Sequence, residues 1–286
     1  MQWTPGGSSE DIEDRRDESG GGGGGFGFGG FHLGIGGFII VGLLSLIFHQ
    51  NLFTLFSGGP TAPTHSQPNR ALDQQEQPEL EFVKFVLNDV QGTWTETLPR
   101  ETNVSYRHAK LVLFRNAYPS ACGTAQSAIG PFYCPGDEKV YLDLGFFNEL
   151  KERFGAPGEF AQAYVIAHEI GHHVQKLLGI ETEIRHLQQQ NPSRARPFSV
   201  RLELQADCLA GVWGNSTHQR NHVQDSEVAQ GLQAAAAVGD DRLQRMATGH
   251  VSPETFTHGS SSQRVHWFRQ GLESGDLKVC EALTRF

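Results

Sequence analysis

A long stretch without charged residues limits most strongly how this chain can fold. From Leu33 onward, no Asp, Glu, Lys or Arg occurs before Arg70. Residues 33–56 are predominantly apolar, and a helix that spans a bilayer needs roughly 20 such residues. A secretory signal would normally begin close to the N-terminus behind a basic patch, and a buried core helix is rarely followed at once by a linker. We therefore predict a transmembrane anchor over residues 33–56, with signal and core helix as the alternatives.

The segments that flank this anchor have compositions that do not favour a core. Residues 1–32 combine a mixed-charge stretch with a glycine-rich tract broken by Phe26 and Phe28. So little apolar surface cannot offset the entropy of ordering the chain, which predicts a disordered tail. Residues 57–78 contain Pro, Gln and Ser in the pattern of a flexible linker. The folded domain is then expected at residues 79–286, which is long enough for one core.

The pattern of apolar residues in this domain predicts an α+β fold. Short strands are indicated in its first half and helices dominate its second half, which is typical of that class. The expected elements are a helix at 79–97, strands at 110–114 and 139–143, and helices at 157–178, 199–213 and 226–246.

The cysteines bear on the compartment of the domain. The chain has Cys122, Cys134, Cys208 and Cys280, and an even number beyond a membrane span is what an oxidising compartment permits. Pairing of Cys122 with Cys134 would close a short loop, and pairing of Cys208 with Cys280 would tie the C-terminus to a helix. Four free thiols are the alternative, because spacing alone does not exclude them. The paired form places the domain on the extracytoplasmic side of the inner (plasma) membrane, opposite residues 1–30.

The strongest local signal is the run Ala167-His168-Glu169-Ile170-Gly171-His172-His173. Residues four apart lie on one face of a helix, so the imidazoles of His168 and His172 can bind one zinc ion. Glu169 projects beside them without being a ligand. It is placed to accept a proton from a water molecule that the metal activates.

A catalytic zinc site uses a third protein ligand and leaves a fourth position open. Glu203 and Asp207 lie four residues apart in the expected second helix, among apolar neighbours. We predict Glu203 as the third ligand. Asp207 is predicted to accept a hydrogen bond from a ligand histidine and so fix its tautomer. A solvated charged face is the alternative for this pair.

Other polar residues compete for roles at this site. His173 is expected to point away from the ligand face, and His186 falls in the connection between the helices. In residues 257–268, His258 or Arg264 could donate to the oxyanion that forms on a scissile carbonyl. Pairing of Arg264 with a carboxylate is the alternative.

Taken together, these segments resemble the bacterial putative neutral zinc metallopeptidase family, and the zinc segments resemble the gluzincins, the thermolysin-like zinc peptidases. The stretches that carry the resemblance are Glu13 to Arg16, the apolar span, Ala121 to Ala125, Phe132 to Asp143, the two zinc segments and Thr257 to Gly259. The resemblance implies a zincin-like fold, in which a small sheet packs on two zinc helices and Val140 to Leu144 is the edge strand for substrate. It also favours His258 over Arg264 as the transition-state donor. The spacing between His172 and Glu203 is longer than in thermolysin, so the flanking pockets of that class do not carry over.

Two classes of function fit these features. A net charge of −9 and a pI of about 5.8 argue against a nucleic-acid partner. The sequence predicts a membrane-anchored zinc metalloendopeptidase that acts on a peptide or protein substrate. The alternative is a membrane-tethered zinc-binding scaffold without turnover. Glu169 discriminates between them, because a structural zinc site has four protein ligands and no use for a free carboxylate.

Overall fold

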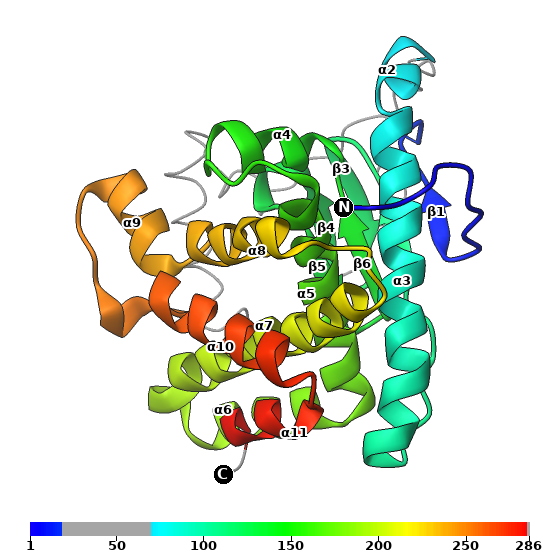
Figure 1. Ribbon diagram of the computed structural model, residues 1–286. Helices are drawn as coiled ribbons and strands as arrows, with labels where there is room; N and C mark the ends of the chain where they lie inside the picture. Colours follow the sequence, from blue (N-terminus) through cyan, green and yellow to red (C-terminus); the bar gives the residue numbers. More distant parts are fainter. Residues whose placement is uncertain (19–69, 285–286) are drawn as a thin grey trace.

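The computed structural model describes residues 1–18 and 70–284, which form a helix-rich α+β fold around a small sheet (Figure 1). The predicted α+β class is therefore confirmed. In Figure 1, α3 stands along one side with β1 beside it, and α7, α8 and α10 lie across the other side. The longer helices are α3 (Gln77–Thr102), α5 (Glu159–Leu177), α6 (Ile180–Gln190), α7 (Ala195–Gln219), α8 (Asp225–Ala237) and α10 (Ser261–Ser274). The shorter ones are α2 (Arg70–Gln75), α4 (Gly145–Glu152), α9 (Asp240–Thr248) and α11 (Leu277–Cys280).

The main sheet has the strand order β1-β2-β6-β5. Strand β1 (Ile12–Asp14) pairs in parallel with β2 (Lys110–Leu113), which pairs in parallel with β6 (Lys139–Leu142). Strand β5 (Phe132–Cys134) is antiparallel to β6. A separate hairpin joins β3 (Ala117–Ser120) to β4 (Gly123–Gln126).

The position of β6 corrects the expected substrate strand. Residues 140–144 were expected to form the edge strand, but β6 is paired on both sides, by β2 and by β5. Its backbone groups are therefore not available to a peptide. The edge strand on this side of the sheet is β5.

The helix expected over residues 226–246 is also wrong, because the structure has two helices there. Helix α8 ends at Ala237 and α9 begins at Asp240. Between them, Gly239 lies so close to α10 that a Cβ atom would come within 2.3 Å of the backbone nitrogen of Ser261. This close approach redirects the chain and brings the buried Asp240 into contact with His258.

The expectation of a disordered tail is wrong for residues 1–18. Strand β1 extends the sheet, and the ring of Trp3 packs edge-on against Phe82 with ring centroids 5.4 Å apart. Arg16 is buried and pairs with Asp14 at 2.7 Å and with Glu76 at 2.9 Å. A polar segment that cannot fold alone can be ordered by adding its backbone to the edge of an existing sheet.

The boundaries around the predicted anchor also shift. The linker was expected over residues 57–78, but α2 and the start of α3 occupy residues 70–78. Within residues 1–18 and 70–284, no helix combines the length and the apolarity that a bilayer crossing requires. The anchor expected at residues 33–56, with the rest of the linker, lies outside the described residues.

Both expected disulfides are present. Cys122 pairs with Cys134 at the end of β5, and Cys208 of α7 pairs with Cys280 of α11. The alternative of four free thiols is therefore wrong. The second bridge fixes the C-terminal segment against α7.

Candidate metal centre

The site is built where α5 and α7 pack against each other. Gly171 of α5 makes this possible, because a Cβ atom there would lie 3.0 Å from the carbonyl oxygen of Ala206 in α7. The close approach brings the histidines of one helix to Glu203 of the other. His168 Nε2 lies 3.3 Å from Glu203 Oε2, and His172 Nε2 lies 3.6 Å from Glu203 Oε1.

These three residues form a set that suits zinc. One ligand atom from each of His168, His172 and Glu203 lies within 4.8 Å of the other two. Two imidazole nitrogens and one carboxylate oxygen are a donor set of catalytic zinc sites, which leave a fourth position open. Among the described residues, this is the one such group of His, Cys, Asp and Glu side chains.

Hydrogen bonds to the far side of each imidazole fix its tautomer. His168 Nδ1 lies 2.9 Å from Asp207 Oδ1, and His172 Nδ1 lies 2.9 Å from Gln175 Oε1. Both partners are acceptors, so both Nδ1 atoms donate and both Nε2 atoms are directed toward Glu203. The chemistry of the donor set therefore fits a divalent zinc ion.

Gln175 links this centre to the C-terminal segment. Its Nε2 donates to the carbonyl oxygen of Leu202 at 2.7 Å and to Gln205 Oε1 at 3.0 Å. Gln205 in turn donates to the carbonyl oxygen of Cys280 at 3.2 Å. The orientation of His172 is thus tied to the segment that the Cys208–Cys280 bridge holds.

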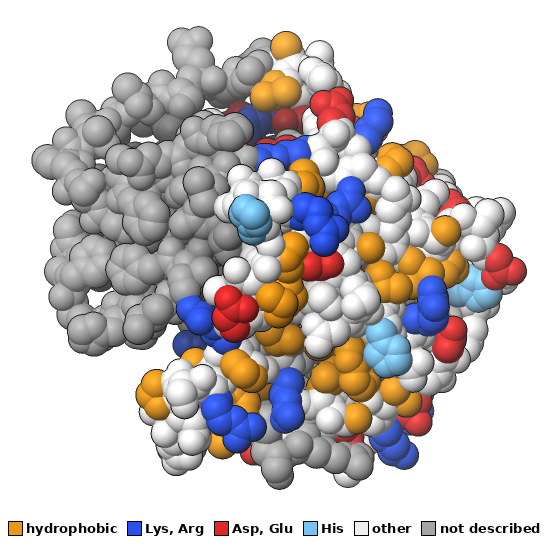
Figure 2. Space-filling model, turned by 90° about the vertical axis from the view of Figure 1, so that its left-hand side faces the viewer, with side chains coloured by type: hydrophobic (Ala, Val, Ile, Leu, Met, Phe, Trp, Pro, Cys, Tyr) orange, Lys and Arg blue, Asp and Glu red, His pale blue; other side chains and the backbone are white. Residues whose placement is uncertain are grey.

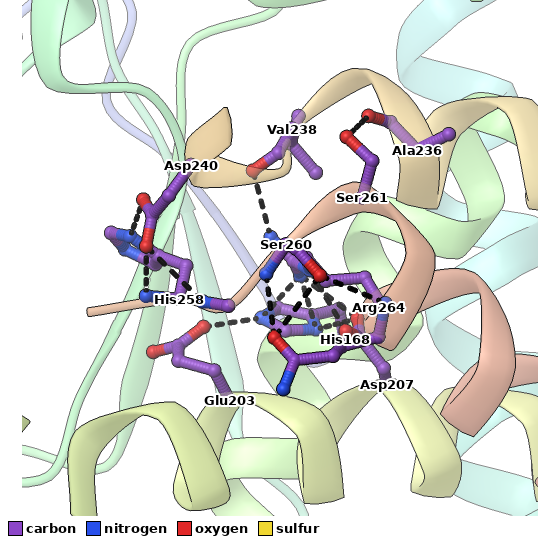
Figure 3. Close-up of polar contacts among 12 residues, drawn as sticks. His168, Glu203, Asp207, Ala236, Val238, Asp240, His258, Ser260, Ser261 and Arg264 are labelled. Atoms are coloured by element: carbon purple, nitrogen blue, oxygen red, sulfur yellow. Dashed lines mark hydrogen bonds and ion pairs between the residues drawn. The ribbon is translucent and has the colours of Figure 1, made fainter. Parts of the chain in front are cut away.

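Asp207 is the centre of a buried polar cluster (Figure 3). Its carboxylate is fully buried and accepts hydrogen bonds from His168, from the hydroxyl group of Tyr164 and from Arg264. Arg264 binds it through two nitrogens, Nε to Oδ2 and Nη2 to Oδ1, each at 2.8 Å. Burial raises the pKa of Asp207, but Arg264 and His168 outweigh this effect and hold it below the ordinary value.

The same contacts decide between the two roles considered for Arg264. Besides Asp207, its guanidinium group donates to Tyr164 at 3.1 Å and to the carbonyl oxygen of Val238 at 3.2 Å. The side chain is buried. Arg264 is therefore the counter-ion of Asp207, and the expectation of a free oxyanion donor is not met.

His258 lies on the other side of Glu203, where Asp240 holds it (Figure 3). Asp240 Oδ1 lies 3.1 Å from His258 Nδ1, and Asp240 Oδ2 accepts from the backbone nitrogens of Thr257 and His258, each at 2.7 Å. Burial lowers the pKa of His258, but Glu203 and Asp240 raise it above the ordinary value. The imidazole is therefore held in one orientation and its charged, donating form is favoured.

Glu169 lies beside the metal-binding set without belonging to it. Its side chain is buried, and it lines the same cavity as His168, His172, Glu203 and His258. Burial raises the pKa of Glu169 above the ordinary value, although His168 and His172 act in the opposite direction. A buried carboxylate with a raised pKa in a cavity is a group suited to proton transfer.

The metal ligands have shifted pKa values for the same reasons. Burial lowers the pKa of His168, but Asp207 and Glu203 outweigh it and raise the pKa to about 9. Burial raises the pKa of Glu203, but His172 and His258 hold it well below the ordinary value. His168 thus carries a proton near neutral pH before the metal binds, and metal binding must displace it.

The remaining histidines of the sequence analysis lie away from the metal-binding set. His173 Nδ1 is 2.9 Å from the hydroxyl group of Tyr133, and its Nε2 is 2.7 Å from the carbonyl oxygen of Arg107. His173 therefore links α5 to the edge strand β5 through a hydrogen bond with Tyr133. His186 is exposed on α6 and contacts Gln190.

Sequence reasoning missed several residues of the centre. Gln175 follows His172 by three residues on the same helix, so its contact could have been expected from helical spacing. Tyr164 precedes His168 by four residues and could have been found in the same way. Asp240 carries no local signal, because it reaches His258 only through the break between α8 and α9.

The chain is similar to known bacterial proteins. It matches the family described as "Putative neutral zinc metallopeptidase" over residues 1–283. It is 44% identical over 285 residues to the uncharacterized protein YpfJ of Escherichia coli (strain K12), an alignment that covers 98% of each chain. It is 42% identical over 208 residues to the uncharacterized protein Rv2575 of Mycobacterium tuberculosis (strain ATCC 25618 / H37Rv), covering 69% of this chain and 68% of that one. No solved structure matches the chain. Zinc, the metal of this family, agrees with the donor set of His168, His172 and Glu203, and the chain belongs to the putative neutral zinc metallopeptidase family.

Proposed function

We propose that this protein is a zinc-dependent endopeptidase in which His168, His172 and Glu203 hold the metal and Glu169 is the general base. One observation carries the proposal. A buried carboxylate that is not a ligand lies next to a three-ligand set, and both face a cavity of about 460 Å³. A structural site would be closed by a fourth protein ligand and would not need that carboxylate.

The residues of the site have different roles in hydrolysis. Zinc, when bound, supplies a Lewis acid that polarises a carbonyl group and makes water more acidic. Glu169 accepts a proton from the attacking water molecule while the oxygen of that water forms a bond to the carbonyl carbon. The same carboxyl group then gives the proton to the nitrogen of the leaving amine as the C–N bond breaks. His258 donates to the oxygen that becomes negative, in the orientation that Asp240 imposes.

Strand β5 supports a zincin-like arrangement for substrate binding. It is the antiparallel edge strand of the sheet, and Phe132 and Tyr133 line the cavity with Glu169. An extended peptide can add to such an edge through main-chain hydrogen bonds. His173 would fix the position of the strand relative to α5 through its hydrogen bond with Tyr133. The test of the proposed function is hydrolysis of a peptide mixture by the parent and by the Glu169→Gln protein.

We also propose that the domain lies outside the cytoplasm and is attached to the inner membrane through residues 33–56. The two disulfides support the compartment. Strand β1 argues against the expected placement of residues 1–30 on the opposite side of the membrane. Residues 1–18 pack on the domain, so both lie on the same side, and a single crossing between them does not fit.

This sidedness predicts the labelling of two single-cysteine variants. Thr4 and Glu254 are exposed, on the N-terminal segment and on the domain respectively. Because the four native cysteines are paired, Thr4→Cys and Glu254→Cys each introduce one free thiol. In intact spheroplasts, a membrane-impermeant maleimide is expected to label both variants to the same extent. Labelling of Glu254→Cys alone would restore the single crossing, and labelling of neither before lysis would place the domain in the cytoplasm.

A further inference from the structure

The cavity of the metal centre continues into a wall of apolar side chains. The polar residues of the centre line one part of it, and the other part lies between the start of β5, α4 and α9. The side chains that form this apolar wall are partly exposed: Ile129, Pro131, Phe132, Phe146, Val238 and Leu243. Figure 2 shows the face that carries α9, where hydrophobic side chains gather in patches between charged ones. Contiguous exposed apolar surface beside a polar centre is a feature of ligand sites.

The charged side chains around this wall, Asp240, Arg264 and Glu181, are engaged with protein partners, so they leave the wall apolar. Asp240 is engaged by His258 and by backbone amides, and Arg264 is engaged by Asp207. Glu181 pairs with Arg185 on α6. The surface that the wall offers to a ligand is therefore apolar.

The wall begins one helical turn from the proposed base. Val165 lines the cavity and precedes Glu169 by four residues on α5, so both lie on the same face of the helix. Phe132 approaches from β5, the strand against which a peptide backbone would lie. A side chain that enters the wall would therefore belong to a residue next to the scissile bond. The whole cavity, with the metal centre and the apolar wall together, has a volume of about 460 Å³, which lies within the roughly 300–1,000 Å³ of small-ligand sites.

We infer that the apolar wall is a specificity pocket that selects peptides with a large apolar side chain, such as Phe or Leu, next to the scissile bond. This inference rests on the proposed function. A polar or charged side chain would lose its hydration in the pocket without gaining a partner, which disfavours it. Discrimination in apolar pockets commonly amounts to about 10–200-fold.

The first test profiles cleavage of a proteome-derived peptide library by the full-length zinc-loaded protein, read by mass spectrometry. Large apolar residues should be enriched at one of the two positions that flank the cleaved bonds. Leu243→Asp places a carboxylate in the wall and should lower kcat/KM for Phe- and Leu-containing peptides by at least about tenfold. Met246→Asp is the matched control, because Met246 is exposed on the same helix and does not line the cavity. It should leave the profile unchanged.

A binding measurement separates failure of the pocket from failure of the proposed function. Calorimetry on the Glu169→Gln protein would compare phenylalanine hydroxamate with aspartic acid hydroxamate, which share the zinc-binding group and need no turnover. The phenylalanine compound should bind at least about tenfold more tightly, and Leu243→Phe should reduce its advantage by filling the pocket. Equal affinities, or library cleavage without apolar preference, would overturn the pocket. Absence of zinc-dependent cleavage together with a strong preference for the phenylalanine compound would overturn the proposed peptidase activity and would support the apolar pocket as a binding site.

Discussion

The Glu169→Gln protein is expected to keep its zinc and to lose at least about 10²–10⁴-fold in the rate of peptide hydrolysis. Gln has nearly the same size as Glu but cannot accept the proton of the attacking water. His168, His172 and Glu203 are untouched, so zinc content and melting temperature should stay close to those of the parent. Hydrolysis would be measured by mass spectrometry on a random peptide mixture at equal zinc content.

The control for this change is Glu183→Gln. Glu183 is exposed on α6, so the same chemical substitution there should leave hydrolysis unchanged. Activity in the parent that survives in Glu169→Gln would refute Glu169 as the base. Silence of the parent on the mixture would favour the zinc-binding scaffold, unless peptides remain bound to the Glu169→Gln protein in a pull-down with the same mixture.

The second large effect is expected from Asp207→Asn. The substitution leaves Arg264 buried without its counter-ion, and breaking a buried ion pair typically costs about 3–5 kcal/mol. The free energy of unfolding, measured with a chemical denaturant, should fall by that amount. Zinc affinity should also weaken by about 10–100-fold, because one uncharged amide oxygen would replace the carboxylate that accepts from His168, Tyr164 and Arg264.

A double variant separates these two effects. Asp207→Leu with Arg264→Met removes both charges, and replacing a buried pair by apolar residues is often close to neutral for stability. The double variant should therefore recover most of the lost unfolding free energy while its zinc affinity remains weak. Recovery of both quantities, or no loss of either in Asp207→Asn, would contradict the assigned role of Asp207.

The parts of this structure that the sequence predicted are those with a local signal. Helices α5 and α7 follow from apolar spacing over several turns, and the ligand pairs follow from four-residue spacing within each helix. That the two helices meet depends on the long-range packing of Gly171 against Ala206. The contact between α5 and α7 could still be expected, because each helix carries a pair of possible ligands at four-residue spacing.

The parts that could not be predicted depend on distant contacts. The residues of α8 and α9 have the composition of one continuous helix, and the break at Gly239 is set by α10, more than twenty residues away. The order of β5 and β6 in the sheet has no signature in strands so short. Residues 1–18 lack the apolar content of a core, and contacts with distant parts of the chain order them, among them the pairing with β2, the packing of Trp3 on Phe82 and the ion pair of Arg16 with Glu76.

The central claim is that His168, His172 and Glu203 together hold one zinc ion. The measurement that tests it most directly is elemental analysis of the full-length parent, Glu203→Ala and Glu183→Ala proteins after identical dialysis. The parent and Glu183→Ala should each retain about one zinc ion per chain, and Glu203→Ala should lose nearly all of it, because the catalytic set has only three protein ligands. Full zinc in Glu203→Ala would contradict the ligand assignment.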